Sequence, residues 1–98
     1  MEIKTIDVNA KEWFDKLNGN SYFAGKVTIN YGTDTEKVIT MPFQYGYGSQ
    51  YMQEASAVLE KETNAKDTYP LYRYCENNSI ILRHNIEINC LLKQLKNI

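Results

Sequence analysis

The sequence predicts an α+β domain with two layers, in which helices pack on one face of a mainly antiparallel sheet of about four strands. Three observations predict this class: two neighbouring segments with a two-residue apolar period, a third near the C-terminus, and an amphipathic helical pattern between them. The 98 residues suffice for a single domain, residues 1–98, and the hydrophobic fraction of 43% is that of a globular protein. The predicted order of elements is β-α-β-β-α-α-β.

The first segment is expected to hold a short strand and a short helix. Residues 3–8 alternate weakly, which indicates a strand. Asn9 precedes Glu12 by three positions, the spacing of a capping box, and this predicts a two-turn helix that ends at Asn18-Gly19. The apolar face of that helix would consist of Trp13, Phe14 and Leu17.

An antiparallel hairpin is expected next. Residues 22–31 and 37–43 both show the two-residue period, and the polar run 32–36 between them is typical of a turn. The second strand would place Ile39, Met41 and Phe43 on one face. Pro42 has no N–H to donate, so it suits an edge strand.

The second half of the chain predicts two helices and a last strand. The main helix begins after the cap residue Ser49 and runs to about Glu62. Its apolar stripe comprises Tyr51, Met52, Ala55, Val58 and Leu59. Pro70 starts a second, short helix. Residues 80–90 then alternate as a strand, and residues 91–97 are compatible with a final helical turn.

Composition narrows the range of partners. The net charge is −1 and the pI is near 5.8, so no global positive field attracts the chain to nucleic acid, and duplex nucleic acid is not an expected partner. No apolar run approaches the roughly 18 residues of a membrane span, and the N-terminus lacks the apolar region of a signal peptide. The sequence therefore predicts a cytoplasmic protein without a membrane partner, with Cys75 and Cys90 as reduced, packed thiols.

The densest chemical signal is the Tyr-Gly loop, residues 45–50, between the hairpin and the main helix. Free amides at a helix N-terminus favour an anion, and glycines let a ligand approach the backbone. The third glycine of a dinucleotide fingerprint is replaced by Tyr51, and no Lys-Ser/Thr pair follows, so the known phosphate loops do not apply. The alternative is that the two glycines only turn a strand into a helix. The predicted ligand- or partner-binding residues are Tyr45, Gly46, Tyr47, Gly48, Ser49 and Gln50, together with Asn20 and Tyr22 from a polar loop nearby.

The chain has eight tyrosines, and two of them, Tyr45 and Tyr47, fall in this loop, which favours a binding role for it. Tyrosine is a frequent interface anchor, and its ring can stack on bases. Phe43, Tyr45 and Tyr47 would share one side if the strand continues through them. The alternative is that these rings complete the core over the sheet.

No catalytic or metal-binding constellation is predicted. Cys75, His84 and Cys90 match no zinc-finger spacing, and three ligands would leave the tetrahedron open. His84 is expected as a hydrogen-bonded histidine in the core or at a sheet edge. The chain is therefore expected to be non-enzymatic, with no cofactor and no metal.

Three segments resemble a group of small proteins encoded by phages and prophages: WFDxxNGNSY over residues 13–22, PFQYGYGxQY over residues 42–51, and YPLYRYC over residues 69–75. The group has no established activity, so the resemblance assigns no functional residue. It implies a small accessory protein of a mobile element, working in the cytoplasm of a host cell.

The expected function is therefore that of a binding protein that inhibits host defence. Its target would be a protein component, in an anti-CRISPR-like role, or a small nucleotide signal. The alternative is a nucleic-acid-binding accessory factor for phage replication or transcription. The hairpin edge and the apolar residues at the C-terminus are also compatible with a homodimer.

Overall fold

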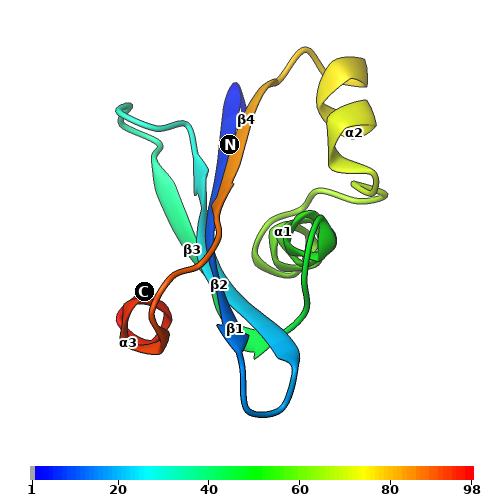
Figure 1. Ribbon diagram of the computed structural model, residues 1–98. Helices are drawn as coiled ribbons and strands as arrows, with labels where there is room; N and C mark the ends of the chain where they lie inside the picture. The colour runs from blue at the N-terminus through cyan, green and yellow to red at the C-terminus, as the bar shows by residue number, and fades with distance from the viewer. Residues whose placement is uncertain (1) are drawn as a thin grey trace.

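A computed structural model, which describes residues 2–98, confirms the α+β class. One sheet has the strand order β3-β2-β1-β4. Its strands are β1 (Thr5–Asp15), β2 (Asn20–Ile29), β3 (Lys37–Tyr45) and β4 (Ile81–Glu87). The helices are α1 (Gln50–Glu62), α2 (Leu71–Asn77) and α3 (Leu92–Lys96). The two longer helices cover one face of the sheet, and α3 lies against the opposite face, here called the second face (Figure 1).

The sheet is mainly antiparallel, as predicted, with one parallel pair between β1 and β4. Asp7 lies opposite Arg83 and Lys11 lies opposite Glu87, and both pairs form salt bridges, at 2.6 and 3.0 Å. Reversing β4 about the Asn9–Asn85 pair would place Asp7 opposite Glu87 and Lys11 opposite Arg83. Like charges directly opposite each other destabilise a sheet. The order of charges therefore favours the parallel pairing.

The predicted helix over residues 9–17 is wrong, because β1 continues through this segment. It pairs with β2 from Ile6–Ile29 to Asp15–Asn20, and β4 pairs along its other side. A central strand gives ladder partners to the backbone groups on both of its edges, which outweighs a local capping signal. Asn18 and Gly19, the predicted helix stop, form the turn that joins β1 to β2.

The main core lies between the sheet and the two longer helices. β1 and β2 contribute Ile6, Val8, Val27 and Ile29 to it, β3 contributes Ile39 and Met41, and the helices contribute Ala55, Leu59, Leu71 and Cys75. The predicted apolar stripe of α1 is confirmed, since all five of its residues are buried or half-buried. The predicted Pro70 helix start and the final helical turn are confirmed as α2 and α3.

A smaller apolar cluster lies on the second face, under α3. Ala24, Cys90 and Leu95 are buried there, and Trp13 and Tyr22 pack against them. The C-terminal residue Leu95 thus covers the sheet of its own chain, whereas Leu91 remains exposed.

A β-bulge in the edge strand β3 changes the side on which Phe43 lies. Gly25 pairs with Met41 and Phe23 pairs with Gln44, so β3 has one extra residue between these pairs. The bulge moves Phe43 to the second face, where its ring stacks on Tyr22. The predicted common face of Ile39, Met41 and Phe43 is therefore wrong for Phe43.

Asn30 is the principal buried polar residue at the end of the sheet opposite the β1–β2 turn. Its side chain accepts hydrogen bonds from the backbone N–H groups of Lys4 (2.7 Å) and Thr5 (3.3 Å). It donates to the backbone oxygen of Glu2 (2.8 Å) and to the Thr35 hydroxyl (2.9 Å). One side chain therefore ties the start of β1 to the β2–β3 turn.

Candidate functional site

The Tyr-Gly loop begins where β3 ends, at Tyr45, and is held against β2. The Gly46 amide donates to the Ser21 carbonyl oxygen at 3.0 Å. A Cβ atom at Gly46 would lie 2.7 Å from the buried ring of Phe23. Glycine is therefore required at position 46 by close packing. Gly48 has open space around it but adopts a φ of +62°, which glycine accepts at little cost.

Two backbone N–H groups of this loop already donate hydrogen bonds to side chains of the same chain. The Tyr47 N–H donates to the Gln50 side-chain oxygen at 2.8 Å, and the Gly48 N–H donates to the Glu12 carboxylate at 3.2 Å. Glu12 thus brings a negative charge to the start of α1, where a bound phosphate would have to lie. A second anion there would meet like-charge repulsion and would lack these two donors. The local geometry favours the interpretation that the glycines serve the strand-to-helix turn.

Ser49 occupies the N-cap position of α1, as predicted, but its side chain forms no capping hydrogen bond. The side chain of Gln50 stabilises the loop instead, through its bond from the Tyr47 N–H.

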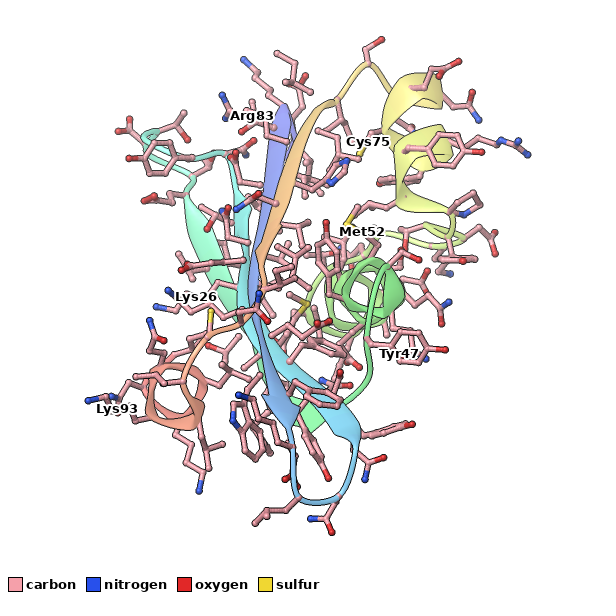
Figure 2. The ribbon with its side chains drawn as sticks, in the orientation of Figure 1. Lys26, Tyr47, Met52, Cys75, Arg83 and Lys93 are labelled. Atoms are coloured by element: carbon pink, nitrogen blue, oxygen red, sulfur yellow. The ribbon has the colours of Figure 1, made fainter. Side chains whose placement is uncertain are left out.

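The tyrosines of the loop lie on different sides of the sheet. Tyr45 packs edge-on against Tyr22 on the second face, with ring centroids 5.9 Å apart. Tyr47 lies on the side that carries α1 (Figure 2). The expectation that Phe43, Tyr45 and Tyr47 share a side holds only for the first two, because the strand ends at Tyr45.

Four rings from three neighbouring strands form an aromatic row on the second face: Trp13, Tyr22, Phe43 and Tyr45. Trp13 stacks on Tyr22 at 5.6 Å, and Tyr22 stacks on Phe43 at 5.1 Å with an angle of 9° between the ring planes. Trp13 and Tyr22 are half-buried, whereas Phe43 and Tyr45 are exposed. The rings therefore pack on one another and still present an apolar edge to solvent. Of the predicted site residues, Tyr22 and Tyr45 meet here, and Asn20 lies two residues away in the same strand.

A groove of about 480 Å³ adjoins the aromatic row at the β1–β2 turn. Its apolar lining consists of Trp13, Phe14, Leu17 and Leu91, so Trp13 belongs to both features. Leu17 is 95% exposed at the turn, and Leu91 is 59% exposed. The row and the apolar lining of the groove together are here called the apolar end.

Cys75, His84 and Cys90 lie apart from one another. Cys75 is buried in the main core, and Cys90 is buried in the cluster on the second face. Burial raises the pKa of the Cys75 thiol to about 11, which keeps it protonated at neutral pH. His84 Nδ1 lies 3.1 Å from the Tyr51 hydroxyl. Within residues 2–98, no three His, Cys, Asp or Glu side chains are grouped to hold a metal ion.

No protein-family model, curated protein or solved structure matches this chain. Among residues 2–98, no helix is long and apolar enough to cross a membrane.

Sequence reasoning missed most of the apolar end because it placed residues 9–17 in a helix. Trp13 and Leu17 were then expected to face the core. A strand interpretation of residues 5–15 would have set Trp13 opposite Tyr22 across the hairpin, and an apolar residue beside Asn18-Gly19 would have marked an exposed turn.

Proposed function

We propose that this chain is a non-enzymatic binding protein whose apolar end docks on a protein partner. One observation carries the proposal: five of the twelve large hydrophobic side chains that are exposed within residues 2–98 belong to the apolar end, in segments 14–17 and 43–45 and at Leu91. These segments meet at one end of the sheet, since Cys90 N–H bonds to the Glu12 carbonyl oxygen and Gly46 N–H bonds to Ser21.

The chemistry of this end suits a protein surface. Contiguous exposed apolar side chains are costly in water and mark interaction sites in monomeric proteins. Trp, Tyr and Phe are also enriched among the residues that contribute most to binding. Leu17 projects from a turn and is almost fully exposed, so a partner would bury far more of it than its own chain does.

The geometry of the Tyr-Gly loop favours a protein target over a small nucleotide. The amides of Tyr47 and Gly48 are bound to Gln50 and Glu12, which leaves fewer donors for a phosphate. The resemblance to phage and prophage proteins supplies the biological setting. We accordingly propose that the partner is a protein component of host defence and that binding inhibits it.

Site-specific photo-crosslinking in host cells tests the proposal. A photoreactive phenylalanine analogue replaces Leu17 in one variant and Tyr31 in the other. Tyr31 is a matched control, because it is 68% exposed but belongs to the β2–β3 turn at the other end of the sheet. We expect one discrete protein adduct from position 17 and none of that mass from position 31. Equal adducts from both positions, or none from position 17, would refute the proposed site.

The captured protein is then purified, and its affinity is measured for the wild type, for the double variant Leu17→Ser/Tyr45→Ala, and for Tyr69→Ala. All three substituted side chains are largely exposed, so thermal unfolding should be nearly unchanged. We expect the double variant to lose at least roughly tenfold in affinity, since two apolar anchors are removed. Tyr69→Ala should bind like the wild type. Inhibition of the partner's activity by the wild type, and not by the double variant, would establish the anti-defence role.

A further inference from the structure

The second face of the sheet carries an excess of positive charge that the net charge of the chain conceals. Five of the eleven basic residues belong to it: Lys11, Lys26 and Arg83 on the strands, and Lys93 and Lys96 on α3. Three acids lie on strand positions of the same face: Asp7, Asp15 and Glu87. The rest of the chain therefore holds six basic and nine acidic residues, a charge of −3 against +2 for this face.

The acids of this face already have partners. Asp7 pairs with Arg83 and Glu87 pairs with Lys11, and the Asp15 carboxylate accepts hydrogen bonds within the β1–β2 turn. Within residues 2–98, Lys26, Lys93 and Lys96 form no ion pair and donate no side-chain hydrogen bond. Figure 2 shows Lys26 and Lys93 on the same side of the sheet, above and beside α3. Three cations are therefore available to an anionic ligand.

A groove of about 400 Å³ lies where α3 meets the sheet; Lys26 lines it, and Lys93 and Lys96 belong to the helix that borders it. The strand register builds its floor: Asn9 is paired with Lys26 on one side and with Asn85 on the other. Gln94 and Asn97 of the α3 segment form one wall, and the Lys11–Glu87 pair forms another. The groove is thus lined by four carboxamide side chains and two lysines.

The carboxamides are unusual in their positions. Asn9 and Asn85 lie in the middle of their strands, where asparagine is disfavoured. The side chains of Asn9, Asn85 and Asn97 form no hydrogen bond within residues 2–98. A carboxamide presents a donor and an acceptor in one plane, which matches the hydrogen-bonding edge of a nucleobase. A lysine ammonium binds phosphate.

We infer that this groove binds an unpaired nucleotide of a single-stranded nucleic acid. The base would lie among Asn9, Asn85 and Asn97, and the flanking phosphates would lie near Lys26, Lys93 and Lys96. The volume suits one nucleotide, and α3, the helix on the second face, has only five residues, too few to read a duplex groove as a recognition helix. An acidic protein would use the lysines but has no need of the carboxamides. The inference concerns a different face and partner from the apolar end and does not rest on that proposal.

Fluorescence anisotropy with labelled 12-nucleotide DNA and RNA strands, at low and rising salt, tests this inference on the full chain. With three lysines engaged, we expect the logarithm of the affinity to fall with the logarithm of salt concentration with a slope of about −2. Lys26→Gln should reduce that slope by about 0.7. The double variant Asn9→Ala/Asn85→Ala should bind roughly tenfold more weakly with the slope unchanged, because it removes base contacts only.

Lys61→Gln and Asn64→Ala are the matched controls, because both residues are exposed at the end of α1, on the other side of the sheet. Thermal unfolding verifies that every variant folds. A poly-glutamate peptide and a 12-base-pair duplex serve as competitors and should displace the strand poorly. The inference is overturned if no strand binds at low salt. It is equally overturned if poly-glutamate competes as well as the strand, or if the asparagine variant binds like the wild type.

Discussion

Removing the side chain of Asn30 should destabilise the end of the sheet opposite the β1–β2 turn and lower the free energy of unfolding. The residue is only 2% exposed, and its carboxamide makes four hydrogen bonds, three of them to backbone groups near the N-terminus. Its φ is +53°, in the left-handed region, which asparagine tolerates better than most residues. Asn30→Gly removes the hydrogen bonds and keeps the backbone unstrained, whereas Asn30→Ala removes the bonds and adds strain.

The size of the effect follows from the contacts. At about 1 kcal/mol for each hydrogen bond, and allowing for partial rescue by water, Asn30→Gly should lower the free energy of unfolding by about 3 kcal/mol. Alanine in the left-handed conformation strains the folded state by about 1–2 kcal/mol. Glycine lowers stability by a smaller amount, roughly 0.4–1 kcal/mol, because it makes the unfolded chain more flexible. Asn30→Ala should therefore be the less stable variant, by about 0.5–1 kcal/mol.

Urea unfolding monitored by circular dichroism measures both variants against the wild type. In thermal unfolding of a domain of this size, about 3 kcal/mol corresponds to a fall in Tm of roughly 12–24 °C. If both variants unfold within about 0.5 kcal/mol of the wild type, water replaces the carboxamide and the hydrogen-bond reasoning is refuted. If Asn30→Ala is as stable as Asn30→Gly, the reasoning on backbone strain fails.

Three further predictions concern the Tyr-Gly loop, the strand charges and the loop after α1. Gly46→Ala should lower the free energy of unfolding by about 1–3 kcal/mol in urea titrations, because the new methyl group overlaps a buried ring. Asp7→Arg or Arg83→Asp alone should lower Tm, and the double swap should restore it, since opposite charges again face each other; three equal Tm values would contradict this account. Hydrogen bonds from Thr68 lower the pKa of Glu60 below its usual 4.5, so their stabilisation is present above that pH and is lost as the pH falls through the folded-state pKa. The stability difference between wild type and Glu60→Gln should therefore shrink from pH 7 to pH 3 in urea unfolding, and a constant difference would refute the linkage.

The sequence alone determined the fold class and most of the elements. The two-residue period identified β2, β3 and β4, because alternation is what a sheet with one buried face requires. The helical stripe from Tyr51 to Leu59 identified α1, and Pro70 marked the start of α2. These signals are local, so they can be recognised without knowledge of the partner element.

Only the tertiary structure decided that residues 9–15 belong to a strand, and this pairing in turn positions the residues of the candidate sites. The spacing of Asn9 and Glu12 is a valid helix signal, but β1 pairs with β2 as far as Asp15 and with β4 as far as Lys11, and these ladders supply partners for its backbone groups. Only that pairing brings Trp13 beside Tyr22 and places Asn9 between Lys26 and Asn85. The bulge that turns Phe43 to the second face is likewise a property of two strands together, and no single stretch of sequence contains it.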